Sequence, residues 1–330
     1  MLRALVLVVF LVLAPSAIAQ EWSVAPDVQD QSIPPPALPE GWTTVRGTFL
    51  RIHGPEHRTE LLLRLSRHGS AAIPRLAETL QVPIGNTIHV YVADTDARFK
   101  ALQPGRPPLW ADATAWPGSG LVFLRDPRLR GGDLEPIEQV FDHELVHILL
   151  GRAFAPERPP SWLQEGAAQV LAGQAGPDVA RELSQAHLRG GIVSLLTLER
   201  GFPRDALRAQ LAYAEAADFV QYLQAEHGDG VLPRLVQASA GGQTLAAAVR
   251  TTTGQSLEEV EDAWSSRWKQ SAALTVGPLA QLDGWLMGLG GVMLLIGGVL
   301  RRRRFHRRLA QMEADELLVD SLAEQLRRSG

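Results

Sequence analysis

The spacing of apolar residues changes character near residue 134. Before that point, apolar and polar positions alternate in three segments, which predicts strands, with one helix over 57–81 between the first two. The strand segments are 43–54, 86–94 and 108–127, the last with a turn at 117–120. From Leu134 onward the spacing is almost entirely helical, in segments at 134–154, 160–173, 177–190, 205–228, 231–242 and 256–270. Because strands precede helices instead of alternating with them, we expect an α+β fold.

Apolar runs near both ends of the sequence indicate membrane targeting. The first run ends at the small residues Ala17 and Ala19, which predicts a signal peptide cleaved after Ala19; an uncleaved anchor is the alternative. The second run, over 284–300, has seventeen uncharged residues, near the lower limit for a membrane-spanning helix. Six arginines between 301 and 308 then place the C-terminal side in the cytoplasm. We therefore expect a single-pass protein of the cell membrane with its folded domain outside the cytoplasm, in the periplasm if the protein is bacterial.

These patterns divide the chain into six parts. They are a signal peptide over 1–19, a proline-rich linker over 20–41, a folded domain over 42–270, a juxtamembrane linker over 271–283, a transmembrane helix over 284–300 and a tail over 301–330. The tail is basic at first and then has amphipathic helical spacing. It either binds a cytoplasmic partner or lies solvated or on the membrane surface.

Composition removes several classes of function. The formal net charge is −4 and the aromatic content 6%, which gives no indication of a basic surface, so we expect no nucleic-acid partner. The chain has no cysteine, which excludes disulfides, a thiol nucleophile and cysteine zinc ligands. In an exported domain, the core and a metal are then the remaining means of stabilisation.

The segment 141–150, FDHELVHILL, is the strongest indication of chemistry. His143 and His147 are four residues apart, so on a helix both imidazoles project from one face. Glu144 lies between them in sequence, on the side where a metal-bound water would lie. The other residues are mostly apolar, which predicts a buried helix in which ionisable groups need a partner. A metal would satisfy them; the alternative is a core helix with two hydrogen-bonded histidines.

A catalytic zinc site needs a third protein ligand and an open position. The extended motif with a third histidine would require glycine at 150 and histidine at 153, but these positions hold Leu150 and Ala153. Glu165 in PSWLQEG, eighteen residues after His147, is the better candidate because it lies on a second apolar helix. Gly166 and the two alanines after it are expected to let this helix approach the first closely.

Four stretches together carry a family resemblance: HELVH, PSWLQEG, AYAEAADFVQYLQAEHG and GQSLEEVEDAW. In this order the chain resembles the peptidase MA-like family of gluzincin zinc metallopeptidases, distant relatives of thermolysin, from about Ile88 to Trp268. The resemblance implies a zincin-like metallopeptidase domain over 42–270 with bound Zn²⁺. It also implies roles for four residues: zinc ligation by His143, His147 and Glu165, and general-base action of Glu144 on a zinc-bound water.

Further site residues are assigned by the same resemblance. Tyr213 is the expected oxyanion donor, because related enzymes use a tyrosine and Tyr213 opens the helix of the family-like block; ordinary packing is the alternative. Substrate backbone is expected to pair with an edge strand formed by Ala113, Thr114, Ala115 and Trp116.

Three polar residues near the motif have open assignments. Gln169 follows Glu165 by one helical turn and is a candidate for orienting a ligand. His187 is either a transition-state donor or a surface residue. Asp142 either supports the site or faces solvent.

The leading functional prediction is a membrane-anchored, extracytoplasmic zinc peptidase acting on a peptide or protein substrate. One alternative is a zinc metallohydrolase of a non-peptide amide, and another is a catalytically idle zincin fold that serves as an envelope scaffold. Retention of the ligand triad and Glu144 argues against the idle fold. It does not separate peptide from other amide substrates.

Overall fold

The computed structural model describes residues 22–23, 32–104, 111–130, 136–176, 183, 193, 195–198, 201–203 and 206–275. The chain divides into two compact units, Met1–Lys269 and Gln270–Gly330, and the first contains the candidate site. The predicted signal peptide over 1–19, the predicted membrane span over 284–300 and the tail lie outside the described residues. Within the described ranges, no helix is both long enough and apolar enough to cross a bilayer.

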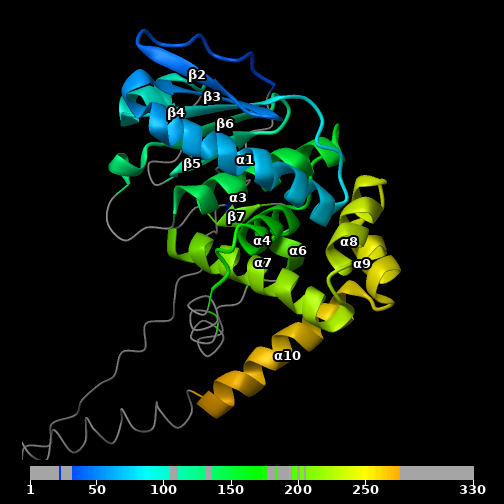
Figure 1. Ribbon diagram of the computed structural model, residues 1–330. Coiled ribbons are helices and arrows are strands. Elements are labelled where there is room, and N and C mark those ends of the chain that lie inside the picture. The colour runs from blue at the N-terminus through cyan, green and yellow to red at the C-terminus, as the bar shows by residue number, and fades with distance from the viewer. Residues whose placement is uncertain are drawn as a thin grey trace, which may run out of the picture. The chain divides into compact units, whose positions relative to one another are not determined.

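The first unit has a strand-rich N-terminal half and a helical C-terminal half (Figure 1). The strands are β1 (Trp22–Ser23), β2 (Trp42–Arg46), β3 (Leu50–Pro55), β4 (Ile88–Ala93), β5 (Ala113–Trp116), β6 (Leu121–Arg125) and β7 (Phe202–Pro203). The helices are η1 (Glu56–Arg58), α1 (Thr59–Leu80), α2 (Asp96–Ala101), η2 (Pro127–Leu129), α3 (Ile137–Phe154), α4 (Ser161–Leu171), α6 (Leu195–Leu198), α7 (Ala206–His227), α8 (Val231–Ala240), α9 (Leu245–Thr253) and α10 (Leu257–Thr275). The prediction of an α+β fold is confirmed.

Five strands form one mixed sheet in the order β2-β3-β4-β6-β5. β3, β4 and β6 are parallel, whereas β2 and β5 are antiparallel to their neighbours. The single strand predicted over 43–54 is wrong, because the chain turns after Gly47 and β2 pairs with β3 as a hairpin. The parallel pair β3 and β4 is joined by α1, as a parallel connection requires a crossover. This local βαβ unit was not expected from the order of the segments.

One face of the sheet is covered by α1 and α3 (Figure 1). The buried leucines of α1 recur at three- and four-residue spacing, which gives the helix a continuous apolar side. A Cβ at Gly69 of α1 would lie 2.9 Å from the ring of Phe141, so this glycine lets α3 approach α1 closely. The metal-motif helix is thereby held against the sheet through α1.

The opposite face of the sheet is covered by α2 and by residues of the predicted linker. The backbone N–H of Ile33 donates to Ser119 Oγ at 2.6 Å, and Ile33 packs against the aromatic residues of this face. The amide oxygen of Gln103, just after α2, accepts from Thr114 and from the indole of Trp116. The side chains of β5 that point to this face are therefore fixed by hydrogen bonds.

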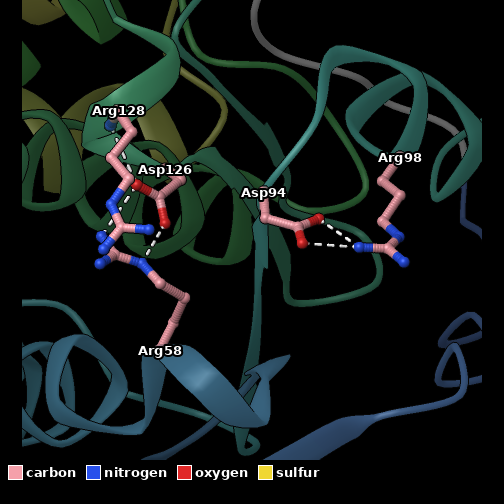
Figure 2. Close-up of polar contacts among 5 residues, drawn as sticks. All are labelled: Arg58, Asp94, Arg98, Asp126 and Arg128. Atoms are coloured by element: carbon pink, nitrogen blue, oxygen red, sulfur yellow. Dashed lines mark hydrogen bonds and ion pairs between the residues drawn. The ribbon is translucent and has the colours of Figure 1, made fainter.

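Ion pairs fix the chain where β4 and β6 end. Figure 2 shows Arg58 of η1 paired with Asp126, which directly follows β6, and Asp94, which follows β4, paired with Arg98 of α2. Asp126 also caps η2 by accepting from the backbone N–H of Arg128. Each aspartate is neutralised by the arginine that it contacts. The pair of Arg58 and Asp126 also joins η1, which follows the first hairpin, to the end of β6.

The helical half is built around close contact between α4 and α7. A Cβ at Gly166 would lie 2.3 Å from the carbonyl oxygen of Ala216, so only glycine permits this approach. The expectation that Gly166 brings α4 close to the motif helix is therefore wrong, because Gly166 faces α7. The backbone of α7, and not a side chain of α3, leaves no room for a side chain at residue 166.

Asp218 connects α7 to α10. Its carboxylate is 7% exposed and accepts from the indole N–H groups of Trp264 and Trp268, at 2.6 and 2.7 Å, and from Arg267. A buried carboxylate with three donors is well compensated, whereas removing it leaves two buried indole N–H groups without an acceptor.

We expect Asp218→Ala to lower the free energy of unfolding by about 3 kcal/mol, because it breaks this buried charged cluster. Urea denaturation of the full chain, followed by tryptophan fluorescence, measures the change. The matched control is Asp262→Ala, an exposed aspartate on α10, which should change stability by less than about 0.5 kcal/mol. Equal effects of the two substitutions would contradict the assignment.

Candidate metal centre

His143 and His147 lie on one face of α3, with ring centroids 4.6 Å apart. The helix is buried along most of its length, and the two side chains are 10% and 0% exposed. Burial, followed by the charge of His143, lowers the pKa of His147 well below its usual value. A neutral imidazole is the form that binds a metal, so the apolar helix holds His147 ready as a ligand.

Glu165 completes the cluster from α4, and it is fully buried. Its Oε2 lies 3.4 Å from His143 Nε2 and 3.6 Å from His147 Nε2. In a tetrahedral zinc site with ligand distances of about 2.0–2.2 Å, ligand atoms lie roughly 3.3–3.6 Å apart. One ligand atom from each of the three residues falls within 4.8 Å of the others. The donor set of two imidazoles and a carboxylate, at this separation, fits Zn²⁺.

Glu144 is 3% exposed and lies on α3 directly after His143. The predicted arrangement is therefore present: two histidines and a carboxylate gathered from two helices, with a second carboxylate beside the first histidine. Burial of both carboxylates keeps water from screening them, which strengthens their interaction with a cation.

Asp142 has a partner that the sequence did not reveal. It is 6% exposed, and its two carboxylate oxygens accept from His68 Nε2 at 2.7 Å and Arg75 at 2.9 Å, both on α1. The hydrogen bond to Asp142 raises the pKa of His68 above its usual value. Asp142, the residue before His143, therefore anchors the motif helix to α1 and does not face solvent.

Gln174 is a contact of the site that sequence reasoning missed. Its side-chain oxygen lies 2.7 Å from His143 Nδ1, although the residue follows α4 and is 31 positions from His143. Gln169, the residue proposed from helical spacing, lies half-buried on α4. Only the loop conformation after α4 brings Gln174 to the ligand, and no periodicity in the sequence reports that conformation.

Tyr213 lies half-buried on α7, with its ring centroid 4.8 Å from that of Phe202. This contact places it where α7 packs against β7. Its proposed role as oxyanion donor stays a prediction. His187, the other candidate donor, lies outside the described residues.

The predicted edge strand, Ala113, Thr114, Ala115 and Trp116, is β5, the last strand of the sheet within the described ranges. The backbone N–H of Arg125 donates to the carbonyl of Asp112, so Asp112 forms a hydrogen-bonded pair with β6. Since such pairs alternate along an antiparallel ladder, the N–H and C=O groups of Ala113 and Ala115 point away from β6. Both residues are buried, with Ala113 4% and Ala115 0% exposed, and pairing of a substrate with this strand stays a prediction.

The comparisons with known proteins identify a family. A family model of the peptidase MA superfamily matches residues 69–270, more than half of the chain. The chain therefore belongs to the peptidase MA superfamily, as its motifs indicated. A search of curated proteins finds no match.

Several solved structures resemble the chain more distantly. The M1 zinc metallopeptidase from Deinococcus radiodurans is 16% identical, with a TM-score of 0.40, and the match covers 69% of this chain and 51% of that protein. A mutant of the same enzyme bound to a Tyr-Ser-Ala substrate gives a TM-score of 0.41. Leukotriene A4 hydrolase from Saccharomyces cerevisiae is 10% identical, with a TM-score of 0.38, and the match covers 68% of this chain and 38% of that protein. This chain thus spans about half or less of these proteins.

We expect the His68–Asp142 pair to make stability depend on pH. A raised pKa means that the folded protein holds the proton more tightly than the unfolded chain, whose histidine has a pKa near 6.5. The pair therefore stabilises fully below pH 6.5 and loses this contribution as the pH rises through the raised pKa. Measured by urea denaturation, the difference between wild type and His68→Gln should shrink from about pH 5.5 to about pH 9. The exposed His57→Gln is the control, and a pH-independent difference for His68→Gln would contradict the role of protonation.

Proposed function

Because the chain belongs to the peptidase MA superfamily, we propose that it is a zinc-dependent peptidase with a zincin-like fold that hydrolyses peptide bonds. One observation carries the proposal: buried ligand atoms of His143, His147 and Glu165 lie within 4.8 Å of one another. The arrangement leaves a fourth position for a reactant, because a catalytic zinc site takes three protein ligands.

Bound zinc and Glu144 would have separate roles in hydrolysis. Zinc, when bound, would polarise the scissile carbonyl and lower the pKa of the attacking water. Glu144 accepts the proton of that water as it attacks and then delivers the proton to the leaving amine nitrogen. Its near-complete burial keeps bulk water from competing for the proton. In this role each ligand has no proton on the atom that would bind zinc, which agrees with the lowered pKa of His147.

The substrate is proposed to be a peptide in extended conformation. The N–H and C=O groups of Ala113 and Ala115 point away from β6, which is the orientation that pairing with an extended chain requires. β5 packs against α3, the helix that carries both histidines. A peptide bound along β5 would therefore run beside the ligand cluster.

The proposed location rests on the sequence at both ends of the chain. The apolar run after Arg3 supports export, and the run over 284–300 with its following arginines supports a single C-terminal anchor. The domain would then act outside the cytoplasm on a peptide or protein substrate, with the tail on the cytoplasmic side.

We expect Glu144→Gln to retain zinc but to lower peptide hydrolysis about 10²- to 10⁴-fold, because the general base is removed and the ligands are kept. The measurements are zinc content of the purified full chain and cleavage of a fluorescence-quenched peptide library. Glu138→Gln is the matched control, since Glu138 lies on the same helix in an ion pair with Arg64.

The outcomes of this experiment are distinct. Wild type without zinc would contradict the site, and equal cleavage by wild type and Glu144→Gln would remove Glu144 as the base. Stoichiometric zinc without cleavage of any peptide would contradict the proposed activity and favour a scaffold or a hydrolase of another amide.

We expect Ala115→Pro to lower kcat/KM for peptides by at least about threefold, because proline removes an outward N–H group worth about 1 kcal/mol in one hydrogen bond. The fold should tolerate the change in this respect, since that N–H does not pair with β6. Ala115→Gly keeps the donor and is the control. Unchanged kcat/KM in a folded, zinc-loaded Ala115→Pro protein would exclude pairing at this position.

A further inference from the structure

Gln174 contacts His143 of the ligand cluster from a loop outside α3 and α4, the two helices that carry the cluster. Its side-chain oxygen lies 2.7 Å from Nδ1 of His143. A carbonyl oxygen only accepts hydrogen bonds, so this contact requires the hydrogen of the neutral imidazole to be on Nδ1. The lone pair is then on Nε2, the atom that lies 3.4 Å from Glu165 Oε2. Gln174 thus selects the tautomer whose free nitrogen faces the other ligands.

The backbone around Gln174 is fixed at several points. Gly173 has a φ of +75°, in the left-handed region that favours glycine, and this turns the chain back after α4. The N–H of Gln174 then donates to the carbonyl of Gln169 at 2.9 Å. Gln221 of α7 donates its side-chain amide to the carbonyl of Ala175 at 3.2 Å. The side chain of Gln174 is therefore presented from a loop anchored to both α4 and α7.

We propose that Gln174 is a positioning residue for the metal site, fixing the ring orientation and tautomer of His143. The proposal rests on the proposed function, since it assumes that His143 binds zinc. Metal-binding histidines usually donate their second N–H to a neighbouring acceptor, and removal of that acceptor typically weakens metal binding about 10- to 100-fold. Gln174 supplies this acceptor as a neutral amide, from a residue that does not touch the metal.

The test is zinc affinity, measured on the full chain by competition with a chromophoric chelator. Gln174→Leu removes the acceptor and is expected to weaken zinc binding about 10- to 100-fold. Gln174→Glu keeps an oxygen acceptor and should bind zinc at least as tightly as wild type. Gln237→Leu, at an exposed position on α8, should leave the affinity unchanged. Thermal unfolding of the metal-free proteins checks that each variant is folded.

A second readout separates positioning from general loss of structure. The visible absorption spectrum of bound Co²⁺ reports ligand geometry, so it should change in Gln174→Leu and be preserved in Gln174→Glu. If Gln174→Leu does not fold, Gln174→Asn tests the same point, because its side chain is one methylene shorter and withdraws the acceptor.

The outcomes distinguish this inference from the proposed function. Wild-type zinc affinity in folded Gln174→Leu or Gln174→Asn, together with an unchanged Co²⁺ spectrum, overturns the role of Gln174 and leaves the proposed function intact. A wild-type protein that takes up no zinc overturns both. Weaker zinc binding in Gln174→Leu, with normal affinity in Gln174→Glu and Gln237→Leu, supports the inference.

Discussion

The Glu165 carboxylate has no solvent exposure, and it lies within 3.6 Å of two imidazoles that are themselves nearly buried. Burying such groups in an apolar interior is unfavourable unless a compensating charge is present. A divalent cation supplies that charge and draws the three donors together. Apolar packing holds α3 and α4 together, and a bound divalent cation would compensate the charge of Glu165 between them.

Three contacts outside the ligand set also hold these two helices in place. The ion pair between Asp142 and Arg75, with the hydrogen bond from His68, fixes α3 to α1 beside the first ligand. Gly166, directly after Glu165, allows the backbone of α4 to touch α7. His143 and Glu165 thus each follow or precede a residue that fixes its helix to a further element. Movement of the metal helices relative to the sheet would break polar contacts as well as apolar ones.

Whether a feature of the fold or site could be predicted from the sequence depends on how far apart along the chain its residues lie. His143 and His147 are four residues apart on one helix, so their spacing sufficed to predict a shared face. Glu165 was identified from its place on a second apolar helix, and the family resemblance implied the same ligand. The hairpin of β2 and β3 was missed because Gly47 interrupts a run that otherwise alternates like one strand. Asp142 and Gln174 make contacts 74 and 31 residues away, which no local pattern encodes.

The C-terminal end of α3 contacts the turn that follows β5, and this contact fixes the strand against the helix. A Cβ at Gly151 of α3 would lie 2.3 Å from Pro117, the first residue of the turn after β5. Arg152 of the same helix donates to the carbonyl of Ile84, and its guanidinium lies beside Gly120 in that turn. This junction, together with the packing of β5 on α3, holds the strand against the helix that carries His143 and His147. A peptide aligned by backbone hydrogen bonds alone would then place successive carbonyls at positions set by the protein. Under the proposed pairing, β5 would set the register of the peptide, and sequence preference would come from other surfaces.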